Sequence, residues 1–137
     1  MRVLIVESEP LIAMSLAAEL RLAGHEVLGP SIDAAEALCL AGEQHADIAL
    51  VDAALESTMG MGATELARML QAHCEVPVLF LTTEPATTHE HSDAALGMIS
   101  LPFDPSDIPQ TIQAAQTLLR GERPAPRTVP HALQLFQ

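Results

Sequence analysis

The chain lacks lysine, tyrosine and tryptophan altogether across its 137 residues. Without lysine it offers no lysine nucleophile and no lysine Schiff base. Without tyrosine and tryptophan it has no aromatic platform on which nucleic-acid bases stack. Positive charge is also scarce, because six arginines face eighteen acidic residues and the formal net charge is −12. Such a chain repels phosphate backbones, so we expect no nucleic acid among its partners.

Long hydrophobic runs are missing as well. No apolar stretch approaches the roughly 20 residues that span a bilayer. The first residues reach Glu7 too early for a secretory signal peptide. We therefore expect a cytoplasmic protein with no membrane partner. The two cysteines, Cys39 and Cys74, stand far apart in apolar helical contexts, which predicts small buried residues rather than a disulfide.

What the chain does have is a regular alternation of apolar runs and helical segments. The length suits one domain, and a composition that is 49% hydrophobic and 18% charged suits a packed core. The expected strands are 2–6, 26–29, 48–52, 76–81 and 97–100, and the expected helices are 10–23, 32–42, 63–72, 86–96 and 104–120. This order predicts an α/β fold in which a single doubly wound, five-stranded parallel sheet carries helices on both faces.

The composition changes after Gly121. We expect a domain over residues 1–120 and a proline-containing tail over 121–137, which ends in an apolar patch at Leu133, Leu135 and Phe136. The tail is interpreted either as a frayed terminus or as a segment that docks onto this chain or a partner.

Polar residues follow the strands at the edge where ligands of open parallel sheets bind. Glu7 follows the first strand, Asp52 ends the third, and Thr82 follows the fourth. The pattern thus predicts two carboxylates and a hydroxyl in one shallow cleft. Because Mg²⁺ takes few carboxylates together with waters and a backbone carbonyl, this cleft is a candidate Mg²⁺ site.

The runs at residues 3–10, 48–52, 78–82 and 101–103 together resemble the receiver domains of bacterial response regulators. The resemblance covers about residues 1–120, in order and at the right intervals. It implies a flavodoxin-like fold with strand order 2-1-3-4-5.

The resemblance also implies a role in two-component phosphorelay signalling. Asp52 would be the phosphoacceptor that takes a phosphoryl group from a histidine kinase or phosphotransfer protein. Glu7, Asp52 and the backbone carbonyl of Ala54 would hold Mg²⁺, and Thr82 would contact the phosphoryl group as a switch residue. A downstream protein target would bind the face made by residues 86–96, 97–100 and 104–120. A homodimer through that face or through the terminal patch stays open.

The chain departs from the family pattern at three positions. Ser8 replaces an acidic residue, Leu101 replaces the lysine before the proline, and Met98 replaces an aromatic switch residue. Each lost charge-assisted contact is worth on the order of 1.5–3 kcal/mol. The chain loses the contacts of the acidic residue that Ser8 replaces and of the lysine that Leu101 replaces. Together these losses disfavour the phosphorylated form by a factor of roughly 10² to 10⁴. We expect weak Mg²⁺ binding and an impaired site.

Three functions remain in competition. The first is a phosphorelay receiver with Asp52 as acceptor, and the second is a pseudo-receiver that binds proteins without phosphorylation. The third is a small enzyme with a phosphoaspartyl intermediate. Such enzymes usually have a second aspartate where this chain has Ala54, and they use a lysine that it lacks. We therefore expect no enzymatic activity.

Overall fold

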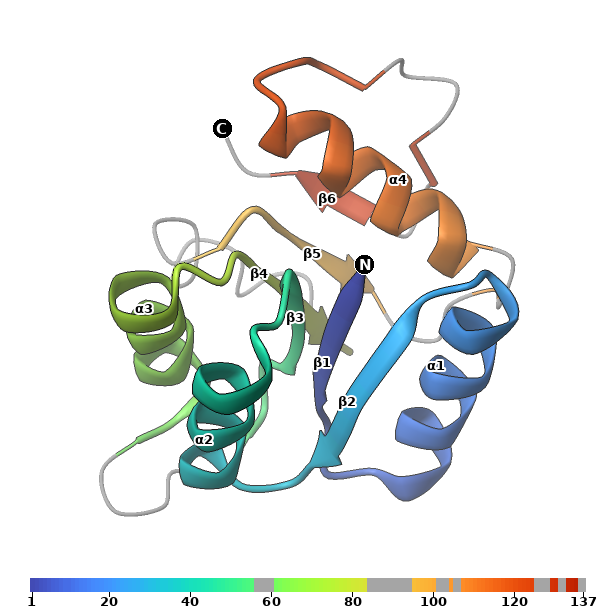
Figure 1. Cartoon of the computed structure of the whole chain (residues 1–137). Coiled ribbons are helices and arrows are strands. Elements are labelled where there is room, and N and C mark those ends of the chain that lie inside the picture. The colour runs from blue at the N-terminus through green and yellow to red at the C-terminus, as the bar shows by residue number, and fades with distance from the viewer. Residues whose placement is uncertain are drawn as a thin grey trace.

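The computed structural model describes residues 1–55, 61–83, 95–100, 104, 107–124, 129–130 and 133–135. Helices and strands alternate along most of the chain (Figure 1). Their order is β1 (Arg2–Val6), α1 (Pro10–Leu22), β2 (Glu26–Ser31), α2 (Ala34–Gln44), β3 (Ile48–Asp52), α3 (Ala63–Cys74), β4 (Val78–Thr82), β5 (Gly97–Ser100), α4 (Asp107–Leu119) and β6 (Leu133–Leu135). None of the helices in these ranges is long and apolar enough to cross a membrane.

The strands form one sheet with the order β2-β1-β3-β4-β5-β6. All pairings from β2 to β5 are parallel, which confirms the predicted doubly wound fold and the order 2-1-3-4-5. The sheet has a sixth strand that the sequence analysis did not predict. β6 lies within the predicted tail and pairs antiparallel with β5. Part of the tail is therefore docked onto this chain, which is one of the two interpretations that the sequence left open.

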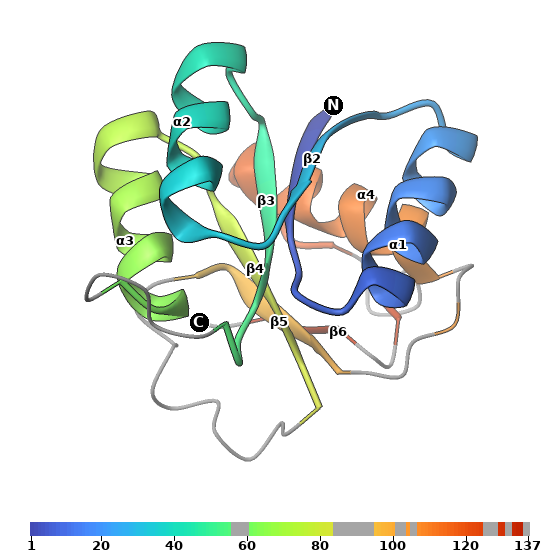
Figure 2. The ribbon, with the colours of Figure 1, turned by 90° about the horizontal axis from the view of Figure 1, so that it is seen from below.

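Helices cover both faces of the sheet, with α2 and α3 on one side and α1 and α4 on the other (Figure 2). Successive strand side chains point to opposite faces, so each buried strand supplies both layers of the core. In β1, Leu4 and Val6 join the core under α2 and α3, whereas Val3 and Ile5 join the core under α1 and α4. This double burial explains why β1 is apolar without alternation.

The predicted helix over 32–42 instead runs from Ala34 to Gln44, because Asp33 begins it. The Asp33 side chain accepts a hydrogen bond from the Ala35 amide at 3.0 Å, which satisfies one of the free donors at the helix start. The predicted helix over 86–96 cannot be placed, since residues 84–94 lie outside the described residues.

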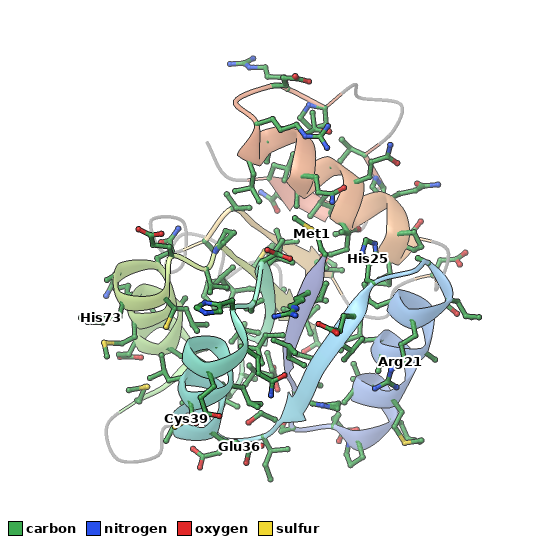
Figure 3. All side chains as sticks on the ribbon, viewed as in Figure 1. Met1, Arg21, His25, Glu36, Cys39 and His73 are labelled. Carbon is green, nitrogen blue, oxygen red and sulfur yellow. The ribbon has the colours of Figure 1, made fainter. Side chains whose placement is uncertain are left out.

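The expectation of two buried cysteines is wrong for Cys39. Its side chain lies on the exposed part of α2 (Figure 3), and Cys74 at the end of α3 is half-buried against the core. The apolar neighbours of Cys39 in the sequence belong to a different face of the same helix, where Ala37 and Ala41 are buried. Both cysteines are free, as predicted.

Candidate functional site

The predicted site residues come together at the carboxyl edge of the sheet, as the parallel topology requires. Glu7 directly follows β1, while Asp52 is the last residue of β3 and Thr82 the last of β4. β3 lies between β1 and β4, with Val6 paired to Val51 and Leu81 paired to Asp52. The fold therefore places all three side chains at the carboxyl ends of adjacent strands.

All three polar side chains are buried at this edge. The exposed fractions are 2% for Glu7, 9% for Asp52 and 6% for Thr82. Burial of carboxylates is costly unless they are hydrogen-bonded or paired with a cation. We call these residues, together with Ser8 and Ala54 beside them, the acidic site.

Asp52 is held by two neutral donors. The Ser8 hydroxyl donates to Oδ2 at 3.0 Å, and the Ala54 amide donates to Oδ1 at 2.9 Å. Ser8 thus does more than remove a carboxylate from the family pattern, because its hydroxyl orients the candidate acceptor. This contact was not predicted from the sequence, although the position of Ser8 directly after Glu7 was the signal for it.

Glu7 is less well satisfied. Its Oε1 accepts a hydrogen bond from the Glu9 amide at 3.1 Å, but its Oε2 is buried and has no hydrogen-bond partner among the described residues. Burial raises the pKa of Glu7 from 4.5 to about 7, and three further contributions add to this increase: the negative charge of Asp52, a hydrogen bond that protonated Glu7 shares with the Asp52 side chain, and the negative charge of Glu9. The Glu9 amide opposes it without cancelling it. Near neutral pH, Glu7 therefore titrates between a neutral and a charged form.

The residues of the acidic site fit a divalent cation. The unpartnered Oε2 of Glu7 and the carboxylate of Asp52 are oxygen ligands of the kind that Mg²⁺ takes, with the Ala54 carbonyl as a third. No group of three or more His, Cys, Asp or Glu side chains that suits a metal occurs in the part of the chain that the structure describes. Glu7, Asp52 and the Ala54 carbonyl would thus be the protein's ligands, and waters would complete the coordination.

Thr82 on β4 and Met98 on β5 are at the two positions to which the sequence assigned a role in switching. Thr82 is paired in register with Ser100, which connects the acidic site to β5. Met98, in place of the family's aromatic switch residue, is completely buried and packs in the same core as Phe80. Leu101 lies outside the described residues, so its predicted place at the site stays a prediction.

The opposite, amino edge of the sheet holds a second group of charges that the sequence analysis did not identify. A hollow of about 520 Å³ is lined there by Met1, Arg2, Gly24, Glu26, His45 and Asp47. Arg2 forms an ion pair with Glu26 at 2.6 Å, and the Arg2 amide donates to Asp47 at 2.7 Å. The terminal amine of Met1 lies 3.2 Å from Nδ1 of His25, beside this hollow (Figure 3). At this edge Glu26 is thus paired with a cation, and the exposed Asp47 accepts a hydrogen bond from a backbone amide.

Comparison with protein families gives one match that covers most of the chain. The model of the response regulator receiver domain matches residues 3–113. This range contains the acidic site and ends within α4.

Two curated relatives show the same similarity. The phyllosphere-induced regulator PhyR of Methylorubrum extorquens is 35% identical over 121 residues, which cover 82% of this chain and 42% of PhyR. The transcriptional regulatory protein PdtaR of Mycobacterium tuberculosis is 33% identical over 123 residues, which cover 87% of this chain and 58% of PdtaR. The chain thus spans only about half the length of these relatives.

Solved structures agree with this family match. The signal receiver domain of a modulated diguanylate cyclase from Desulfovibrio desulfuricans superposes with a TM-score of 0.75 at 28% identity, covering 87% of this chain and 97% of that one. The response regulator PhyR of Brucella abortus superposes with a TM-score of 0.70 at 26% identity, covering 88% of this chain and 52% of that one.

Proposed function

The chain belongs to the response regulator receiver domain family, and from that premise we propose that Asp52 accepts a phosphoryl group from a phosphohistidine in a kinase or phosphotransfer protein. The observation that supports this proposal best is the buried group of Glu7, Asp52 and Thr82 at the carboxyl edge. A buried acidic pair is costly to keep, so its presence at the end of strands whose buried residues are mostly apolar favours a chemical role.

The proposed step is a phosphoryl transfer. An Asp52 carboxylate oxygen attacks phosphorus, the P–N bond to the imidazole breaks, and the imidazole nitrogen keeps the electron pair. The product is an acyl phosphate on Asp52. Ser8 and the Ala54 amide already hold the two oxygens of the carboxylate, and positioning of this kind is the main protein contribution to phosphoryl transfer. The Thr82 hydroxyl would then contact the phosphoryl oxygens.

Mg²⁺ is the cofactor that this proposal requires. Glu7, Asp52 and the backbone carbonyl of Ala54 would hold it, and when bound it neutralises negative charge on the phosphoryl oxygens. The chain replaces one family acid with Ser8 and the family lysine with Leu101. We therefore expect phosphorylation to be slow or short-lived in comparison with a receiver that has both.

One observation favours the pseudo-receiver as a second candidate function. The hydroxyl of Ser8 already occupies Oδ2 of Asp52, and a pKa of about 7 leaves Glu7 partly protonated near neutral pH, so part of the negative charge that would attract a metal ion is already offset without one. A chain of this kind acts by binding a protein. In the family pattern that surface includes β5 and α4, and no turnover of a substrate is proposed for either function.

A phosphodonor experiment separates the two functions. The chain is incubated with a small-molecule phosphodonor, with and without Mg²⁺, and its intact mass is measured. We expect a Mg²⁺-dependent phosphoryl adduct that is absent from Asp52→Asn. The matched control is Asp47→Asn, which keeps the adduct because Asp47 lies at the amino edge of the sheet and is not part of the acidic site. Absence of the adduct in the unmodified chain supports the pseudo-receiver instead.

A further inference from the structure

The sixth strand closes an edge that the receiver fold otherwise leaves open. β6 pairs with β5 in antiparallel register, with Leu135 opposite Gly97, Gln134 opposite Met98 and Leu133 opposite Ile99 (Figure 1). An unpaired strand edge binds other extended chains readily. β6 is therefore both a part of the sheet and an occupant of a strand-binding edge.

Gly97 leaves room on β5 for the backbone of a closely approaching strand. A Cβ atom at position 97 would collide with the carbonyl oxygen of Gln134 and would lie 3.0 Å from the Cα of Leu135. Glycine in a strand interior often marks such a close backbone approach. Any side chain at this position is thus incompatible with β6 in its observed place.

The side chains of β6 alternate in the way the edge requires. Leu133 is 6% exposed and packs in the core under α1 and α4, Gln134 is exposed, and Leu135 packs partly against the same core. The edge thus selects an extended segment with apolar residues at alternate positions.

β6 is a short element, and its docking rests on few groups. Among the residues that the structure describes in this part of the chain, three pair with β5, and Leu133 is the buried one of these three. Elements with few buried contacts are the first to open in native proteins. When β6 leaves, β5 presents unpaired backbone groups next to the apolar side chain of Ile99, and Leu133 loses its place in the core.

The charge distribution favours a second copy of this chain as the exchange partner. All eighteen acidic residues lie in residues 1–122, whereas the last fifteen residues carry two arginines and no acid. A whole copy repels another, but the terminal segment is attracted by the acidic remainder of its neighbour. The segment that fits the β5 edge is thus also the segment whose charge suits a second copy.

The chain is long enough for exchange. Thirteen residues separate Leu119 at the end of α4 from Leu133 at the start of β6. A segment of that length spans about 40 Å when extended, which exceeds the diameter of a small domain. Docking to the same copy and docking to a neighbour are therefore both within reach.

We propose that the last strand exchanges between two copies of this chain, with residues 133–135 of one copy paired to Gly97–Ser100 of the other and the reverse. Exchange of an identical element produces a closed, symmetric dimer with no contact that the single copy lacks. The inference concerns the β5 edge alone and does not depend on phosphorylation of Asp52.

A complementation experiment with two full-length variants tests the exchange. Leu133→Asp puts a charge at a buried position of β6, which removes the docking strand but leaves the β5 edge intact. Gly97→Ala blocks the edge but leaves the terminal segment intact. We expect each variant to remain monomeric alone at about 100 μM, because each lacks one half of the contact. A mixture of the two is expected to form a one-to-one heterodimer in native mass spectrometry, with one variant isotope-labelled.

Three results would overturn the proposal. They are a mixture that stays monomeric, a variant that dimerises alone as well as the unmodified chain does, and an unmodified chain that shows no dimer at any concentration. Circular dichroism must show that both variants keep the helical content of the unmodified chain. If Leu133→Asp fails this requirement, Leu135→Asp replaces it, since Leu135 is only partly buried.

A labelled peptide of residues 129–137 gives an independent measurement on the same proteins. It is expected to bind Leu133→Asp saturably in fluorescence anisotropy, and at least tenfold more weakly to the unmodified chain, whose own β6 competes. The double variant Leu133→Asp/Gly97→Ala serves as the matched control and is expected not to bind. Equal binding to all three proteins contradicts a docking site at the β5 edge.

Discussion

The two edges of the sheet treat their acidic residues in opposite ways. At the amino edge, Arg2 forms an ion pair with Glu26 through its guanidinium and a hydrogen bond with Asp47 through its amide. At the carboxyl edge, Glu7 and Asp52 are buried, and the charges that act on Glu7 come from Asp52 and Glu9, which are both negative.

The difference shows which acids serve the fold and which wait for an external partner. Acids that are paired with a cation, as Glu26 is, or exposed to water, as Asp47 is, need nothing else. Buried acids held only by neutral donors retain an unsatisfied charge, which a proton, a metal ion or the metal that accompanies a phosphoryl group can satisfy. The unpartnered Oε2 of Glu7 is the clearest sign of this state among the described residues. The predictions below test the contrast between the two edges, in order of decreasing effect.

The largest effect is expected from restoring the family's charges at the carboxyl edge. The double variant Ser8→Asp/Leu101→Lys should raise Mg²⁺-dependent phosphorylation by a factor of roughly 10² to 10⁴, because it returns two charge-assisted contacts of about 1.5–3 kcal/mol each. The extent of phosphorylation is measured by intact mass against the concentration of phosphodonor. Adding Asp52→Asn to the double variant is the control and should abolish the adduct. No gain in the double variant contradicts the account of the site.

The next effect is on stability and its pH dependence. The folded pKa of Glu7 is about 7, above its ordinary value of 4.5, so the folded chain holds a proton that the unfolded chain releases between these values. The contribution of Glu7 to the free energy of unfolding should therefore fall as pH rises from 4.5 to 7, by at most about 3 kcal/mol, and stay reduced at higher pH. Urea denaturation at pH 5 and pH 8 measures this.

Two matched variants isolate the contribution of Glu7. Glu7→Gln removes the charged form, so it should lose this slope and be more stable than the unmodified chain at pH 8 by at most about 3 kcal/mol. Glu26→Gln at the amino edge should keep the slope. If Glu7→Gln is less stable than the unmodified chain at pH 8, the buried charge of Glu7 does not lower the free energy of unfolding, and the inference is wrong.

A smaller effect is expected from Mg²⁺ binding to the unphosphorylated chain. With a dissociation constant in the millimolar range, about 10 mM Mg²⁺ should raise the free energy of unfolding at pH 8 by about 1 kcal/mol. The increase should disappear in Glu7→Gln and persist in Glu26→Gln. Tight binding that saturates at micromolar Mg²⁺ and depends on Asp52 would refute the weak site.

The fold was largely predictable because its signals are local. β1 and β3 are buried on both faces, so their sequences are apolar without interruption, and the polar residue after each run marks its carboxyl end. β6 was not predicted as a strand because three residues carry no periodic signal. Its partner β5 is more than thirty residues earlier in the chain, and the pairing depends on the missing side chain of Gly97.

The site was predictable in its composition but not in its interactions. Parallel topology was enough to bring Glu7, Asp52 and Thr82 to one edge. The Ser8–Asp52 hydrogen bond and the unpartnered oxygen of Glu7 depend on side-chain rotamers and on local burial, which a sequence pattern does not encode. The ion pair at the amino edge was missed because Arg2 and Glu26 are distant in sequence and adjacent only through the β1–β2 register.

The smallest effect is expected at the amino edge. Arg2 and Glu26 have side chains that are 49% and 59% exposed, so water and salt screen their attraction although the atoms are only 2.6 Å apart. Arg2→Gln should therefore lower the free energy of unfolding by less than about 1 kcal/mol, and the loss should shrink further in about 0.5 M salt. Urea denaturation at both ionic strengths measures it. If Arg2→Gln lowers the free energy of unfolding as much as Glu7→Gln raises it, the ion pair at the amino edge stabilises the fold as strongly as the buried charge of Glu7 destabilises it. The contrast between the edges would then no longer identify the carboxyl edge as the functional one.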